Sequence, residues 1–186
     1  SAVPADADVV LRVQHVNAGP MVRDISFELK RGEILGFAGL IGAGRSETAR
    51  AIFGADEIQS GSVEIDGRPA PIESPVDAVA HGIAYLSEDR KRYGLALNLD
   101  VKDNVVMATY EHFTSGPFIR KRKIAQAARE YVDKLAIKTP SVDQLVRNLS
   151  GGNQQKVVLA KWLIRNCDIL IFDEPTRGID VGAKSE

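Results

Sequence analysis

The hydrophobic pattern predicts three short strands in the first 70 residues. Residues 25–29 and 63–66 alternate strictly, and residues 9–16 are rich in strand-forming side chains. The segment at 63–66 runs into Asp66-Gly67, a dipeptide typical of tight hairpin turns. A period of two belongs to a half-buried strand, so we predict an antiparallel β portion here.

Three further apolar runs predict buried strands, at residues 33–38, 83–86 and 168–172. The first enters a glycine-rich loop, and the last is the most strand-like run in the chain. Helical segments lie between them, predicted at 46–53, ended by Gly54, and at 151–166. Strands that alternate with helices favour a largely parallel sheet.

The middle of the chain has a different pattern. Residues 101–110 and 121–136 are predicted to be helices, and the second carries an apolar face made of Ile124, Ala128, Tyr131, Val132 and Leu135. The stretch from 99 to 149 is therefore predicted to be a helical insert between two strand-bearing parts.

Composition narrows the function classes. The chain has 186 residues, 44% of them hydrophobic and 26% charged, with a formal net charge of -1. That length suggests one domain. A net charge near zero gives no overall positive field that would attract nucleic acid. No apolar run approaches the length of a membrane span. Residues 1–8 lack the pattern of a signal peptide and are interpreted as a linker or an artificial end.

A phosphate-binding loop is predicted directly after the strand at 33–38. The segment Gly39-Leu40-Ile41-Gly42-Ala43-Gly44-Arg45-Ser46 matches G-x-x-x-x-G-K-[ST] except at Arg45, where lysine is expected. Its glycines let backbone N–H groups converge on phosphate oxygens, and the start of the following helix adds partial positive charge. The Ser46 hydroxyl is a candidate Mg²⁺ ligand. An ordinary glycine-rich turn without a ligand is the alternative.

An acidic pair follows the strand at 168–172. Open α/β sheets place their ligands at the carboxyl ends of strands, where Asp173 and Glu174 lie. Asp173 suits the Mg²⁺ shell, and Glu174 could orient the attacking water or accept its proton. The alternative is a solvated Asp-Glu-Pro turn.

A second candidate anion site opens the helix at 151–166. Ser150 is a candidate N-cap, and Gly151 and Gly152 leave backbone N–H groups accessible. Two chains packed head to tail would place this segment opposite the partner's phosphate loop. An ordinary capped helix is the alternative.

Together these segments resemble the ATP-binding cassettes of the ABC transporter family. Residues 149–153, LSGGN, are similar to the signature motif LSGGQ, with Asn153 in the final place. GLIGAGRS resembles Walker A, ILIFDE resembles Walker B with its catalytic glutamate, and residues 176–180 resemble the D-loop. The resemblance runs from residue 9 to the end of the chain, with the motifs in the family's order.

The resemblance implies an α/β fold of the P-loop NTPase class, an ABC-type cassette with a mainly parallel core sheet. It implies an ATP-binding domain over residues 9–186, with its core at 9–98 and 150–186 and a helical subdomain at 99–149. ATP and Mg²⁺ are the implied cofactors, and Glu174 is the implied catalytic residue. Metal contacts are implied for Ser46, Glu88 and Asp173, and nucleotide contacts for Gly39, Leu40, Ile41, Gly42, Ala43, Gly44, Arg45, Ser46, Glu47, Ser150, Gly151, Gly152 and Asn153.

Arg45, the run EDRKRYGL and LSGGNQQK resemble the second cassette of twin-cassette monosaccharide importers of the ribose, xylose, arabinose or galactose type. The run starts at Glu88, where the family has the glutamine of its Q-loop. This resemblance implies a peripheral protein at the cytoplasmic face of the cell membrane. Its implied partners are a second cassette, transmembrane permease subunits and, indirectly, a periplasmic sugar-binding protein, with no nucleic acid.

The chain departs from the family pattern in three ways. No aromatic residue lies at 16–19 to stack on adenine, lysine is absent from Walker A, and no histidine follows the D-loop. We therefore expect a chain truncated at its C-terminus, a degenerate ATP site at Arg45, and a weak or inactive, mainly monomeric ATPase in isolation. The alternatives are a non-hydrolytic regulatory nucleotide-binding domain and a soluble ABC ATPase not tied to transport.

Overall fold

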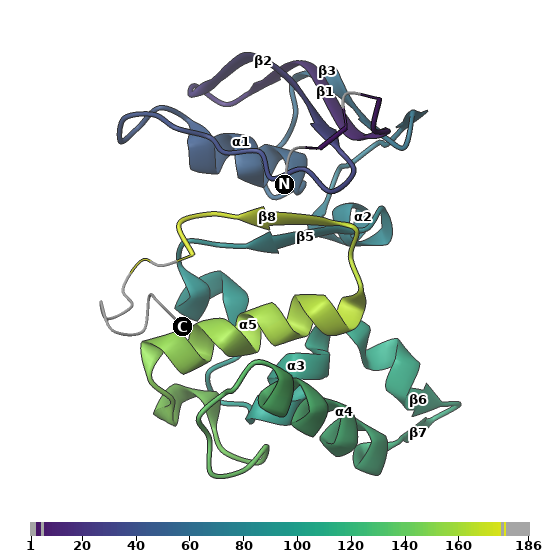
Figure 1. Ribbon diagram of the computed structural model, residues 1–186, viewed down its shortest axis with the longest axis vertical. Helices are drawn as coiled ribbons and strands as arrows, with labels where there is room; N and C mark the ends of the chain where they lie inside the picture. The colour runs from purple at the N-terminus through teal and green to yellow at the C-terminus, as the bar shows by residue number, and fades with distance from the viewer. Residues whose placement is uncertain (1–2, 5, 176, 178–186) are drawn as a thin grey trace. The chain divides into compact units, whose positions relative to one another are not determined.

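A computed structural model of the protein describes residues 3–4, 6–175 and 177. The chain forms two compact units, labelled by element in Figure 1. The first contains the described residues up to Tyr85 together with Asp168–Ile171, and the second contains Leu86–Cys167, Phe172–Pro175 and Arg177.

The first unit begins with a four-stranded antiparallel sheet in the order β2-β1-β3-β4. Its strands are β1 (Val9–Ala18), β2 (Val22–Lys30), β3 (Ser60–Ile65) and β4 (Arg68–Pro69). Val13 of β1 lies opposite both Phe27 and Val63, and its side chain is 1% exposed. Side chains that alternate across a strand thus bury one face of this sheet, and the predicted antiparallel portion is confirmed.

The turn between β3 and β4 is the predicted hairpin. Asp66 has a φ of 47° and Gly67 a φ of 71°. Positive φ at both central residues is the requirement of a type I′ turn, which explains why Asp-Gly occupies it.

Helix α1 (Arg45–Ile52) and helix α2 (Pro75–Ala80) complete this unit, together with all but the last residue of β5 (Ile83–Leu86) and of β8 (Ile169–Phe172). The strands β5 and β8 form a two-stranded sheet. The Ile169 amide donates to the Gly82 carbonyl (3.1 Å), and the Asp173 amide donates to the Leu86 carbonyl (2.9 Å). Residue numbers rise together along both strands, so the pair is parallel, as the sequence predicts for these two runs.

The prediction of a strand at 33–38 is wrong for this structure. These residues adopt no regular secondary structure, and Ile34 and Phe37 are 97% and 51% exposed. A strand requires a hydrogen-bonded neighbour, and residues 33–38 pair with none of the strands in the described chain. The apolar run has strand propensity, but it has no neighbouring strand to pair with in the described chain.

The second unit is helical. It contains α3 (Val101–Val106), α4 (Lys121–Lys134) and α5 (Gly151–Arg165), which pack against one another, with the shorter elements η1 (Arg90–Gly94), η2 (Met107–Phe113) and η3 (Val146–Asn148). A small antiparallel hairpin, β6 (Thr114–Ser115) and β7 (Phe118–Ile119), precedes α4. The core is built from aliphatic side chains at most 2% exposed, among them Val101, Val105, Val106, Ile124, Val157 and Val158.

The helix predicted at 101–110 is shorter in the structure. The α-helix ends at Val106, and the chain continues as a 3₁₀-helix to Phe113. Thr109 leaves helical geometry (φ -138°), while its buried hydroxyl donates to the Val106 carbonyl at 3.2 Å. A Thr side chain that bonds to the preceding turn competes with regular helix hydrogen bonding, which accounts for the break.

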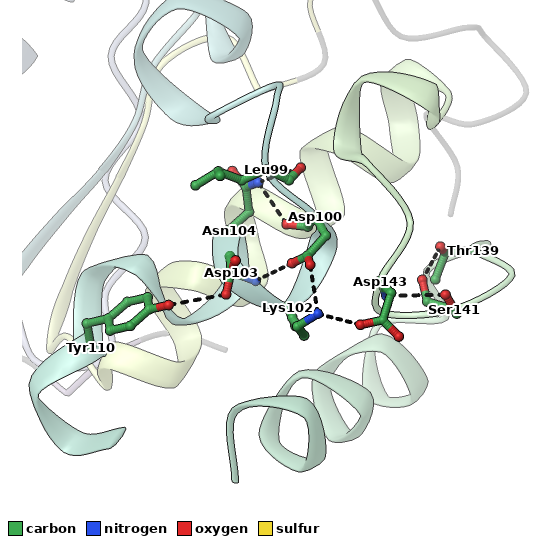
Figure 2. Close-up of polar contacts among 9 residues, drawn as sticks. All are labelled: Leu99, Asp100, Lys102, Asp103, Asn104, Tyr110, Thr139, Ser141 and Asp143. Carbon is green, nitrogen blue, oxygen red and sulfur yellow. Dashed lines mark hydrogen bonds and ion pairs between the residues drawn. The ribbon is translucent and has the colours of Figure 1, made fainter. Parts of the chain in front are cut away.

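A polar network holds the start of α3 against the loop at 139–146 (Figure 2). Asp100 is the N-cap, and its carboxylate accepts from the Asp103 amide (2.9 Å) and from the Lys102 ammonium (2.7 Å). Lys102 also pairs with Asp143, and both carboxylates raise the pKa of Lys102. The buried Asn104 side chain donates to the Ala96 and Asp100 carbonyls at 3.0 and 2.9 Å.

Replacing Asp100 with alanine is expected to lower the free energy of unfolding by about 1.5 kcal/mol, because the helix cap and a partly buried ion pair are lost together. Urea unfolding followed by circular dichroism measures the change. Asp143→Ala serves as the control, since its side chain is 68% exposed and caps no helix. Equal midpoint shifts in the two variants would contradict the assignment of the cap.

In the described parts of the chain, none of the helices combines the length and the apolar composition of a membrane-spanning segment.

Candidate functional site

The glycine-rich loop forms a turn that leads directly into α1. The Ala43 amide donates to the Leu40 carbonyl (3.1 Å), and Gly42 has a φ of 81°. That φ is the value that the third residue of a type II turn needs. Gly44, with a φ of 82°, is the N-cap of α1 and provides no side-chain cap. The predicted helix after the loop is confirmed to within one residue at each end.

Gly44 is held by a close approach of the backbone. A Cβ at this position would lie 2.7 Å from the Met21 carbonyl oxygen, so the turn between β1 and β2 closes over the loop. The Gly44 carbonyl accepts from both the amide and the hydroxyl of Thr48, at 2.8 and 2.7 Å. Gly44, at the end of the loop, is therefore held by the Met21 backbone and by Thr48. No pattern in the sequence predicted that Met21 lies against this loop.

The other predicted phosphate-loop residues lie at the surface. Gly39 to Ala43 are exposed, with Leu40 and Ile41 at 85% and 100%, and Arg45 and Ser46 are half-buried in the first turn of α1. Glu47 pairs with Arg50 across one turn at 3.8 Å. An accessible backbone at the start of a helix is the arrangement that binds anions.

The acidic pair lies at the end of β8, in the second unit. Asp173 is 8% exposed, and its amide hydrogen bond to Leu86 continues the parallel pairing. Glu174 is exposed and has a φ of 44°. A non-glycine residue at positive φ costs about 1–2 kcal/mol, and such strain gathers at functional positions.

Glu88 pairs with Arg177, whose carbonyl also accepts from the Arg90 guanidinium (3.0 Å). These three residues, with Asp89 and Lys91, line a cavity of about 390 Å³. Arg177 is a contact that the motifs did not predict, although it falls in the segment resembling the D-loop. Thr176 and residues 178–180 of that segment lie outside the described residues.

The LSGGN segment caps α5 as predicted. The Ser150 hydroxyl accepts from the Asn153 amide (3.4 Å) and from the Asn153 side chain (2.8 Å). The Asn153 side-chain oxygen accepts from the Lys138 amide at 2.7 Å. Asn153 therefore fastens the loop after α4 to the start of α5, while Gly151 and Gly152 form its half-buried first turn.

The predicted site residues thus belong to two groups. Gly39 to Glu47 lie in the first unit, and Glu88, Ser150 to Asn153, Asp173 and Glu174 lie in the second. Among the residues that the structure describes, no three His, Cys, Asp or Glu side chains gather as a metal-binding cluster. A Mg²⁺ ion held mainly by phosphate oxygens needs only one or two protein ligands.

Residues 22–177 match the ABC transporter family. The chain belongs to this family. It is 58% identical over 180 residues to the putative ribose/galactose/methyl galactoside import ATP-binding protein 3 of Burkholderia ambifaria, covering 96% of this chain and 35% of that protein. It is 56% identical, with 96% and 36% covered, to the corresponding import ATP-binding protein of Albidiferax ferrireducens. The chain therefore spans about a third of these curated relatives.

Solved ABC structures share the fold. CbiO1 from Clostridium perfringens, part of the ABC transporter complex CbiONQ, superposes with a TM-score of 0.74 at 22% identity, covering 96% of this chain and 70% of that one. The cassette MJ0796, in a dimeric post-hydrolysis state with ADP and Pi, gives 0.76 at 20% identity, with 94% and 78% covered. The predicted P-loop NTPase fold of the ABC type is therefore confirmed.

Proposed function

We propose that this ABC transporter chain is an ATP-binding domain that couples ATP binding and hydrolysis to the import of a monosaccharide. The observation that carries the proposal is the loop geometry: two glycines at positive φ directly before α1, in a chain 58% identical to a sugar-import ATP-binding protein. The proposed domain covers residues 9–186, with its core at 9–98 and 150–186 and a helical subdomain at 99–149.

The proposed phosphate site is the segment from Gly39 to Glu47. Backbone amides of the turn and of the first turn of α1 bind phosphate oxygens, and Arg45 adds positive charge in place of lysine. The planar guanidinium cannot follow the path of a lysine ammonium, so this site is proposed to hydrolyse ATP poorly.

We propose Ser46 and Asp173, one in each unit, as magnesium ligands on the chemistry of each side chain. Ser46 offers a hydroxyl at the start of α1, and Asp173 offers a buried carboxylate at the end of a parallel strand. Bound Mg²⁺ neutralises charge on the phosphates during transfer. Glu88 is proposed as a further metal contact, and its carboxylate pairs with Arg177 in this structure. Exposed Glu174 orients the attacking water or accepts its proton.

Ser150, Gly151, Gly152 and Asn153 are proposed to complete an ATP site on a second cassette, in the same polypeptide or in a dimer. Opening and closing of the two cassettes would drive transmembrane permease subunits, with a periplasmic sugar-binding protein acting indirectly. The proposed location is the cytoplasmic face of the cell membrane. The support is the capped, accessible start of α5 and the names of the relatives.

Nucleotide binding by the purified chain tests the phosphate site. We expect a fluorescent ATP analogue to bind more tightly with Mg²⁺ than with EDTA, and Ser46→Ala to remove most of that difference, roughly tenfold for one lost ligand contact. Ser62→Ala, at an exposed position on β3, is the matched control. Equal magnesium dependence in the Ser46→Ala variant would contradict the proposed metal site.

ATP turnover by the intact transporter tests the roles proposed for Arg45 and for Ser150. Ser150→Ala is expected to lower ATP hydrolysis, because it acts on the partner cassette's site, and Arg45→Lys is expected to raise it. If Ser150→Ala leaves turnover untouched, the proposed role of this segment is wrong. Co-purification with permease subunits distinguishes the importer from a soluble ABC ATPase.

A further inference from the structure

We propose that the β6–β7 hairpin and the first turn of α4 form a docking surface for an anionic lipid membrane. This basic hairpin surface consists of Phe118, Ile119, Arg120, Lys121, Arg122 and Lys123. It lies within the second unit and shares no residue with the proposed nucleotide sites.

The hairpin presents apolar side chains to solvent. Phe118 and Ile119 are 74% and 49% exposed, although both are large hydrophobic residues. The Arg120 amide donates to the Phe113 carbonyl (2.8 Å), which closes the hairpin base. In Figure 1 the hairpin projects from the helical unit beyond the ends of its helices. An exposed apolar pair at such a tip is available to enter a membrane interface.

Four consecutive basic residues follow the apolar pair. Arg120 to Lys123 are all exposed, and the sequence holds no acidic residue between Glu111 and Glu130. Glu111 is itself paired with Arg165. The whole chain has a net charge of -1, so this concentration of positive charge is local.

The positive charges do not serve the stability of α4. They surround the helix N-terminus, where the backbone dipole is already positive, and the first turn contains no acidic residue and no side-chain cap. Cations at this end of a helix are unfavourable. An external negative surface offsets that repulsion, which the first turn of the helix does not relieve by itself.

Anionic lipid fits this surface better than other polyanions. A membrane interface accepts an aromatic and an aliphatic side chain together while its headgroups attract the neighbouring Lys and Arg. Single-stranded nucleic acid is instead bound by several aromatic platforms, and the surface contains one aromatic ring. Lipid docking does not depend on the ATP site, so either can fail alone.

Vesicle co-sedimentation of the purified chain tests the proposal. We expect binding to phosphatidylcholine vesicles that contain phosphatidylglycerol, no binding to pure phosphatidylcholine, and weaker binding as salt rises. The double variant Arg122→Ala/Lys123→Ala should lower the partition coefficient roughly 30-fold, at about fivefold for each charge. Alanine at these exposed positions favours the helix, so folding is retained.

The matched control is Arg129→Ala/Lys134→Ala, which removes the same charge near the other end of the same helix. This control should bind anionic vesicles nearly as well as the unaltered chain, and Phe118→Ser should weaken binding several-fold. Equal losses in both double variants would show a net-charge effect and overturn the proposal. So would binding to a polyanionic RNA that depends on Arg122 and Lys123 without binding to vesicles.

Discussion

Gly44→Ala is expected to lower the free energy of unfolding by about 3 kcal/mol. The new methyl group would lie 2.7 Å from the Met21 carbonyl oxygen, and the residue would be forced to keep a φ of 82°. Left-handed geometry costs an L-residue about 1–2 kcal/mol, and forced overpacking adds about 1–3. Urea unfolding followed by circular dichroism measures the loss.

Gly42→Ala provides the comparison. Gly42 has a φ of 81°, but a Cβ added there would meet no atom within 4 Å, so only the backbone contribution of about 1 kcal/mol remains. The two variants share chemistry and φ and differ in the neighbouring backbone. Equal destabilisation would show that the contact with Met21 does not hold the loop. If Gly42→Ala stays folded, with only this small loss of stability, but loses ATP affinity, the proposed phosphate cradle is supported.

Lys161 is expected to make stability depend on pH between 8 and 10.5. Its ammonium is buried on α5 and donates to the Gly94 carbonyl at 2.7 Å, and burial lowers the pKa of Lys161 to about 8. Between these pH values the unfolded chain holds the proton that the folded chain has released. The free energy of unfolding therefore rises with pH in this window, by about 3 kcal/mol in total.

Lys161→Met isolates this contribution, because every other titrating group is shared with the unaltered chain. The difference in unfolding free energy between the two proteins should change across that window and stay level below it. Lys102→Met is the control, since hydrogen bonds with Asp100 and Asp143 raise the pKa of Lys102 above its usual value. A difference that stays flat from pH 8 to 10.5 for Lys161→Met would contradict a depressed pKa.

Much of the local structure could be predicted from residue patterns. The strands near Val13 and Val63, the turn at Asp66-Gly67, and helices α1, α4 and α5 follow from periods and caps that act over a few residues. The phosphate loop could also be predicted locally, from the spacing of its glycines, and the structure places Gly42 and Gly44 at positive φ.

The failures share a physical cause. Residues 33–38 have strand propensity, yet no strand of the described chain pairs with them, and the helix from Val101 breaks early where Thr109 bonds to the preceding turn. In both cases the outcome depended on hydrogen-bond partners, a missing neighbouring strand in one and a side-chain hydroxyl in the other, which hydrophobic periodicity does not show.

The sequence by itself determined the order of the elements, the turn chemistry and the motifs that place the chain among ABC transporters. Only the tertiary structure decided that Met21 closes over Gly44, that Arg177 pairs with Glu88, and that Lys161 is buried against Gly94. Propensity and periodicity act within a few residues of the chain. Steric approach, ion pairing and desolvation depend instead on which distant segment packs beside a residue, and folding sets that neighbour.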